Sequence, residues 1–128
     1  TFSFLSTEVV KYSSAAAANA AQKELVKVLA QCQAEKGYKD ATGTLVPYAF
    51  KKLPAVPAGV VSEGNRVFVH AVIDTGIRAR TLLGFYQFSG DTFTGLYVLN
   101  AEGFSDAQVS KWLKVAATMG QRLQGKAS

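Results

Sequence analysis

Apolar residues recur along three successive segments in the second half of the chain, and in the first of these segments both faces are largely apolar. Arg66 to Asp74 and Ile77 to Phe88 flank the turn Thr75-Gly76, and Ser89-Gly90-Asp91 leads into Thr92 to Leu99. Their composition predicts strands, and strands joined by such short turns pair as antiparallel neighbours. The pattern therefore predicts an antiparallel meander.

A helix follows the meander, from Ser105 to about Gln124. Ser105 is the expected N-cap, Gln108 completes a capping box, and Phe104 is placed to pack on the first turn. The spacing of the apolar residues predicts a buried stripe that docks on one face of the meander, where full burial of a large side chain contributes about 2 to 3 kcal/mol. The stripe comprises Val109, Trp112, Leu113, Ala116, Met119 and Leu123.

The first half of the chain carries weaker signals. Phe2 to Tyr12 reads as a strand, and an alanine-rich helix from Ser14 to Lys36 is expected to end at Gly37. Leu45 to Leu53 is a weaker strand, and the prolines of the segment from Pro54 to Gly59 indicate a loop or a sheet edge.

The predicted order is strand, helix, four strands and helix. This order predicts an α+β fold, with helices packed on a mostly antiparallel sheet. The length of 128 residues suits one domain spanning 1–128, and 48% hydrophobic with 18% charged residues argues against disorder. The final helix shields one face of the meander, so the other face is open to the first helix, a ligand or another chain.

Charge and cysteine content narrow the function classes. The net charge is +5, but the basic residues are dispersed along the chain and not gathered in a stripe with aromatic residues, which argues against nucleic-acid binding. Cys32 is the single cysteine, which excludes an intrachain disulfide and a cysteine-based zinc site. It shares a helical face with Leu25, Val28 and Leu29, and we expect it to be a small buried hydrophobe. No apolar run is long enough to span a membrane.

The predicted strands carry large residues on both faces, which indicates an apolar groove or a covered surface. We expect one sheet face to bind an unidentified small or lipid-like ligand. An alternative is a structural domain that uses this face to form a homodimer or to bind a partner protein. The candidate ligand-binding residues are Phe68, His70, Arg80, Leu82, Tyr86 and Tyr97.

An enzyme is a more distant hypothesis. His70 and Asp74 share a strand face but lie about 13 Å apart at the strand rise, too far for a hydrogen bond. Arg78 or Arg80 could join them in a polar patch, which is more typical of a solvated strand end. We therefore assign no catalytic residue, no metal ligand and no cofactor. The residues considered for catalysis are Cys32, Glu63, His70, Asp74, Arg78, Arg80 and Asp91.

The overall pattern loosely resembles a known group of domains. A strand, a Ser-Ala-Ala-Ala run, a helix containing Leu29-Ala30-Gln31-Cys32, further strands and a last helix ending in Arg122-Leu123 resemble the secreted sensor domains of actinobacteria. These include lipoproteins of the cell envelope and the extracellular domain of some mycobacterial serine/threonine kinases. The resemblance implies a non-enzymatic, extracytoplasmic domain, secreted or lipid-anchored, that binds a ligand in a cleft of the sheet. It assigns no functional residue.

Overall fold

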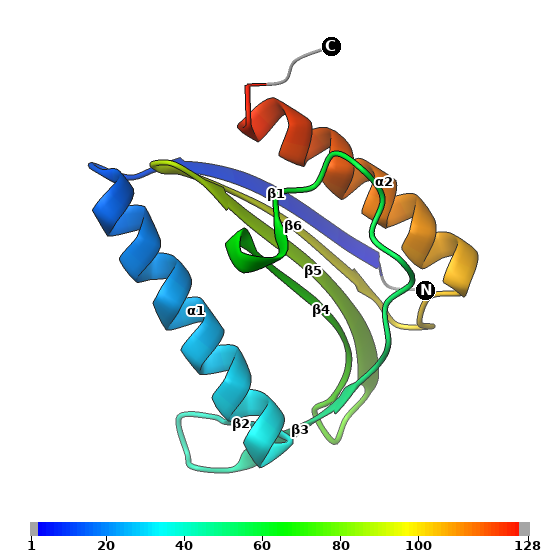
Figure 1. The fold of residues 1–128 in the computed structure, drawn as a ribbon. Helices are drawn as coiled ribbons and strands as arrows, with labels where there is room; N and C mark the ends of the chain where they lie inside the picture. The colour runs from blue at the N-terminus through cyan, green and yellow to red at the C-terminus, as the bar shows by residue number, and fades with distance from the viewer. Residues whose placement is uncertain (1–2, 126–128) are drawn as a thin grey trace.

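The computed structural model describes residues 3–125 of the chain. They form six strands, two α-helices and one short 3₁₀ helix, η1 (Figure 1). In chain order the elements are β1 (Ser3–Lys11), α1 (Ala15–Glu35), β2 (Gly37–Lys39), β3 (Leu45–Phe50), η1 (Glu63–Asn65), β4 (Arg66–Asp74), β5 (Ala79–Ser89), β6 (Thr92–Asn100) and α2 (Asp106–Leu123).

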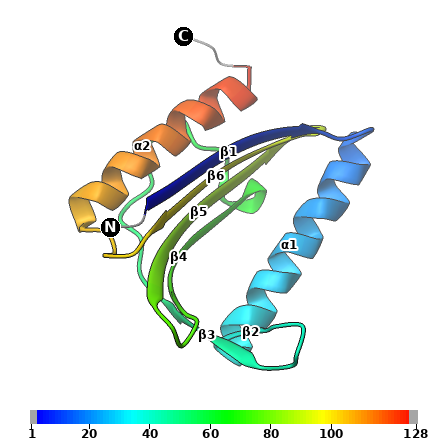
Figure 2. The ribbon, with the colours of Figure 1, turned by 180° about the vertical axis from the view of Figure 1, so that it is seen from behind.

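The strands form one antiparallel sheet in the order β1-β6-β5-β4-β3-β2. The sheet is curved, and the two helices lie on opposite sides of it, with α1 on the concave side (Figures 1 and 2). This arrangement confirms the α+β class, the meander and both long helices. The sequence did not predict β2 or η1, which are three residues each. The first predicted strand residue, Phe2, lies outside the described residues.

The helix α2 covers the convex face of the sheet. Its capping box is present: the Ser105 hydroxyl accepts the Gln108 N–H at 3.2 Å, and the Gln108 side chain accepts the Ser105 N–H at 2.7 Å. Leu113 and Val109 from α2 meet Phe85 of β5, and all three are almost fully buried. The core therefore lies between α2 and the convex face. Val109, Leu113 and Ala116 of the predicted stripe are buried, whereas its other members are only partly buried: Trp112, Met119 and Leu123.

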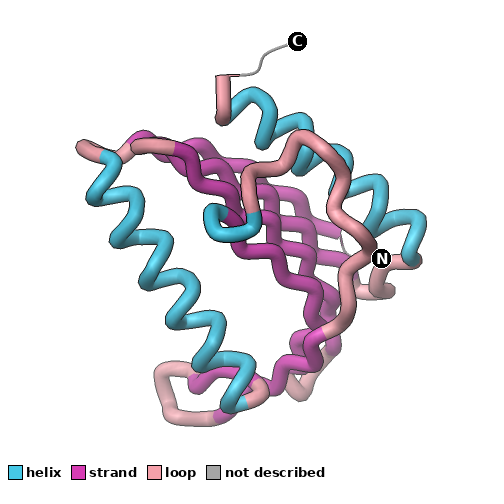
Figure 3. Tube along the Cα trace, in the orientation of Figure 1, coloured by secondary structure: helices cyan, strands magenta, loops and turns pink. Residues whose placement is uncertain are grey.

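A buried glutamine ties three segments together behind this core. Gln87 on β5 is 1% exposed; its amide oxygen accepts the Val61 N–H at 3.1 Å, and its amide nitrogen donates to the Ala116 carbonyl at 2.9 Å. The loop between β3 and η1 thus runs beside α2 (Figure 3), where the Gln124 side chain also donates to the Gly59 carbonyl. One side chain holds this loop against both the sheet and the helix.

The helix α1 begins and ends where its capping residues are placed. The Ser14 hydroxyl accepts the Ala17 N–H at 3.0 Å. At the other end, the left-handed residue is Lys36, at φ 57°, and not Gly37 as the sequence suggests. Gly37 instead begins β2, where any side chain would collide with the Val46 carbonyl of β3. The glycine is therefore required for close strand pairing directly after the helix.

Candidate ligand-binding cavity

The helix α1 touches the sheet closely only near its two ends. Near its start, Ala18 is 1% exposed and the Gln22 side chain donates to the Gly64 carbonyl at 2.6 Å. At its end, the Lys36 carbonyl accepts the Tyr48 N–H of β3 at 2.9 Å. Ala18 and Gln22 are the only buried residues among the 21 of this helix. The middle of α1 therefore spans the concave face without closing on it.

A cavity of about 680 Å³ lies between the middle of α1 and the concave face. A volume in this range is typical of sites that take up small molecules. Its walls are mostly aliphatic and aromatic. They are formed by Leu25, Val28, Leu29, Gln31, Cys32 and Glu35 of α1, Gly37, Tyr38 and Lys39 of β2, Tyr48 and Phe50 of β3, Val67 and Val69 of β4, and Leu82 and Tyr86 of β5.

Two glycines shape the sheet beside this cavity. Gly84 lies opposite Tyr97, and Gly95 lies opposite Tyr86, in the pairing of β5 with β6. A methyl group at Gly84 would come within 2.9 Å of the Tyr86 ring, and one at Gly95 within 3.0 Å of the Phe93 ring. The Tyr86 ring therefore lies low over Gly84, a position that a larger residue would not allow.

A smaller hollow of about 250 Å³ adjoins the cavity on the same face. Tyr86 lines both, so the two spaces are neighbours at this residue. The remaining walls come from β1 and β6, and the Phe4 and Tyr97 rings meet edge to face at 6.3 Å. We call this space the β1 hollow. It is lined by Phe4, Ser6, Glu8, Tyr86, Gly95 and Tyr97.

The predicted site residues divide between the two faces of the sheet. Leu82 and Tyr86 line the cavity, and Tyr97 lines the β1 hollow. Arg80 lies two residues before Leu82 on β5 and is therefore on the same face of the sheet, opposite Ile73 of β4. Placing Phe68 and His70 on this face was wrong, because they lie opposite Phe85 and Leu83 on the convex side.

The number of residues between β4 and β5 determines which of their side chains share a face. Four residues separate Asp74 from Ala79, and an even number places even positions of β4 opposite odd positions of β5. The predicted two-residue turn Thr75-Gly76 has the same parity, so it already implied that Phe68 and His70 do not share a face with Leu82 and Tyr86. The β4 residues on the concave face are therefore Val67, Val69 and Ala71.

The polar residues considered for catalysis are not brought together. His70 is buried on the convex side; its ring nitrogen Nδ1 lies 3.1 Å from the Lys52 carbonyl, and its ring meets that of Phe104. The Asp74 carboxylate accepts the Gly76 N–H in its own turn. Cys32 faces the cavity on the opposite side of the sheet. Within residues 3–125, no group of three or more histidine, cysteine or acidic side chains is placed to hold a metal ion.

Cys32 is partly exposed in the cavity wall and does not belong to a packed core, which corrects the expectation of full burial. Desolvation by burial, together with the nearby Glu35 carboxylate, raises the pKa of its thiol. A raised pKa lowers the thiolate fraction and hence the reactivity of a cysteine. Cys32 thus acts as an apolar part of the wall.

Two tyrosines of the cavity should lose their phenolic protons at a higher pH than an unfolded tyrosine does. Burial raises the pKa of both Tyr86 and Tyr48 to about 12, whereas an unfolded tyrosine titrates near pH 10. Between these values the unfolded chain has lost protons that the folded chain keeps, so the free energy of unfolding should fall as the pH rises. Urea unfolding at pH about 9 and about 11 measures this fall, and Tyr86→Phe should reduce it. If tyrosinate absorbance shows all five tyrosines titrating together near pH 10, these rings are not buried as described.

A second cavity, of about 500 Å³, lies between β1 and α2 on the convex side. Its walls include Val9, Val115, Met119 and Leu123. It lies at the opposite edge of the sheet from β2, beside β1, whose Val9 side chain is 73% exposed. This cavity is the competing location for an apolar ligand.

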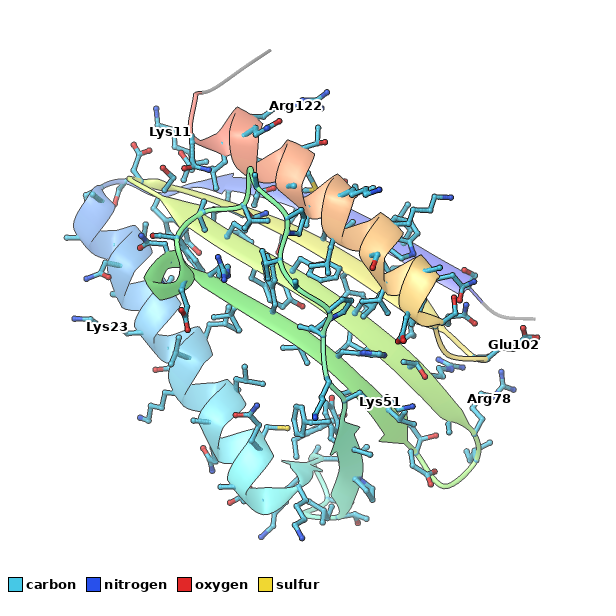
Figure 4. All side chains as sticks on the ribbon, turned by 45° about the vertical axis from the view of Figure 1, so that its right-hand side comes forward. Lys11, Lys23, Lys51, Arg78, Glu102 and Arg122 are labelled. Carbon is cyan, nitrogen blue, oxygen red and sulfur yellow. The ribbon has the colours of Figure 1, made fainter. Side chains whose placement is uncertain are left out.

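Charged side chains are spread around the molecule. Lys11, Lys23, Lys51, Arg78 and Arg122 lie on separate elements and loops (Figure 4), in keeping with the dispersed basic residues of the sequence. No helix within the described part of the chain is both long and apolar enough to cross a membrane.

Comparisons of this chain with protein-family models, with curated proteins and with solved structures each gave no match. The functional argument therefore depends on the cavity itself.

Proposed function

We propose that this chain is a binding domain that takes up an apolar or amphiphilic small molecule between α1 and the concave face of the sheet. One observation carries the proposal: α1 is held at both ends, while the apolar side chains at its middle face the sheet across about 680 Å³. In a helix serving only stability, these side chains would pack on the sheet, as those of α2 do.

The exposed apolar side chains of α1 support the proposal that a ligand covers them. Val28 is 52% exposed although it lines the cavity, and Leu25 and Leu29 are only half-buried. Burying a side chain of this kind fully contributes about 1.5 to 3 kcal/mol. An apolar molecule that covers these side chains and the facing Val69 and Leu82 would gain that free energy on binding.

A bulky substitution in the cavity wall tests the proposal. Leu29→Trp should weaken binding of decanol or the neutral fluorophore N-phenyl-naphthylamine about tenfold, because the indole displaces at least two methylene equivalents at about 0.8 kcal/mol each. Titration calorimetry and probe fluorescence measure the affinity, and circular dichroism checks the fold. Val26→Trp is the matched control, since Val26 lies on the same helix, is 48% exposed and does not line the cavity. Equal binding by both variants would contradict the proposal.

A sensing role in an extracytoplasmic location, as the resemblance to secreted actinobacterial domains implies, is compatible with such a cavity and stays a prediction. The alternative of a homodimer or a protein partner on the sheet also stays a prediction. In the structure each face of the sheet carries a helix, so a second copy would meet the sheet at its edges.

A further inference from the structure

The β1 hollow differs chemically from the cavity that it adjoins. Three aromatic rings, those of Phe4, Tyr86 and Tyr97, and one carboxylate, that of Glu8, line a space of about 250 Å³. Aromatic faces attract cations through the ring quadrupole, and several rings around one space form the cages that recognise quaternary ammonium groups. The carboxylate supplies a charge of the opposite sign.

The strand register explains how these groups surround one point. Glu8 lies opposite Gly95, and Gly95 lies opposite Tyr86, so one row across the sheet reads carboxylate, glycine, ring. Since neighbouring strands are about 4.8 Å apart, Glu8 and Tyr86 stand about 10 Å apart, and the edge of the Phe93 ring reaches over the glycine between them. Tyr97 belongs to the next row on the same face, opposite Ser6. The glycine adds no side chain of its own to the hollow that the carboxylate and the rings border.

The carboxylate of Glu8 is available for a ligand. Its side chain is exposed, and the hydrogen bond at this residue is made by its backbone carbonyl, which accepts the Thr94 hydroxyl at 3.2 Å. No residue between 3 and 125 forms an ion pair with Glu8. A cation entering the hollow would therefore meet an uncompensated negative charge without displacing a protein side chain.

We propose that the β1 hollow binds a compact organic cation of the alkylammonium class, and that the ligand of this domain is an amphiphile with an ammonium head in the hollow and an apolar chain in the α1 cavity. The second half of this statement rests on the proposed function, because the chain must lie where the apolar ligand was placed. Tyr86 lines both spaces, so head and chain can be parts of one molecule.

Because the net charge of the chain is positive, tighter binding of a cation than of an anion would be a specific sign of the β1 hollow. At +5, long-range attraction favours anions over cations. A cation that binds more tightly than an anion with the same apolar chain must therefore be recognised by local groups, and the β1 hollow supplies them.

Three probes with the same alkyl chain separate the two parts of the proposal. Decyltrimethylammonium carries a cationic head, decyl sulfate an anionic head, and decanol a small neutral head; all are titrated below micelle formation by calorimetry. We expect decyltrimethylammonium to bind more tightly than the other two. Glu8→Gln and Tyr97→Leu should each weaken it about tenfold while leaving decanol unchanged, because cation–π and charge contacts are lost and apolar ones are kept.

The control for charge is Glu24→Gln, which removes a carboxylate from the exposed surface of α1 away from both spaces and should change nothing. If decyltrimethylammonium binds no better than decanol, or if Glu8→Gln has no more effect than Glu24→Gln, the cation site is refuted. If decanol itself binds equally to the protein and to Leu29→Trp, the proposed function fails instead. The two failures are thus distinguished by different variants and different probes.

Discussion

Replacing Phe85 by alanine is expected to lower the free energy of unfolding by about 3 to 5 kcal/mol, the range for removing a large buried aromatic side chain. Phe85 is fully buried at the centre of β5, contacts the Phe68 ring edge to face at 5.0 Å, and belongs to the core cluster with Leu113. Two effects contribute to this loss: the folded state no longer gains the free energy of burying the ring, and a cavity is left beneath α2.

Urea unfolding followed by circular dichroism measures this loss. The matched control is Phe50→Ala, which also removes a phenylalanine ring from a strand, but from the wall of the open cavity, where the side chain is only partly buried. Its cost should be well below that of Phe85→Ala. Equal costs would mean that the concave face is packed as tightly as the convex face, and the cavity would then not exist as described.

Replacing Gly120 by alanine is expected to destabilise the protein by about 2 to 4 kcal/mol, although alanine is the better helix former by about 1 kcal/mol. An added methyl group would collide with the amide oxygen of Gln87 and come within 2.7 Å of the Gly59 carbonyl. The amide oxygen cannot turn away freely, because it accepts the buried Val61 N–H. Relief of the collision therefore leaves a buried donor without its partner.

Thermal and urea unfolding of Gly120→Ala test this expectation against Gly64→Ala. A methyl group added at Gly64 in η1 would meet no heavy atom within 4 Å, and this glycine has no positive φ, so its substitution should change stability little. A neutral or stabilising effect at Gly120 would show that α2 and the loop from β3 to η1 do not lie as close as described.

The fold could be predicted from the sequence where local signals are strong. Ser105 and Gln108 mark the start of α2, and the composition of Arg66 to Asp74 predicts β4 with the bounds that it has in the structure. The short strand β2 escapes prediction because three residues carry no measurable period. Its cue is Gly37, which the sequence suggests as the end of α1 but which is in fact the point where β2 meets β3.

The site could be predicted only in part. Leu82, Tyr86 and Tyr97 do lie on one face, but Phe68 and His70 do not share it, because an even number of residues in the turn places even positions of β4 opposite odd positions of β5. The apolar face of α1 has the spacing of a core helix. Such spacing shows which side chains face the sheet, but it does not show whether they touch the sheet. Leu29 and Cys32 do face the sheet, across a cavity.

The central claim, an apolar ligand between α1 and the concave face, is tested most directly by nuclear magnetic resonance with methyl-labelled protein and unlabelled decanol. We predict intermolecular Overhauser effects from the decanol chain to the methyl groups of Leu29, Val69 and Leu82. Effects confined to Val9, Val115 and Leu123, at the cavity between β1 and α2, or no effects at any of these methyl groups, would contradict the account.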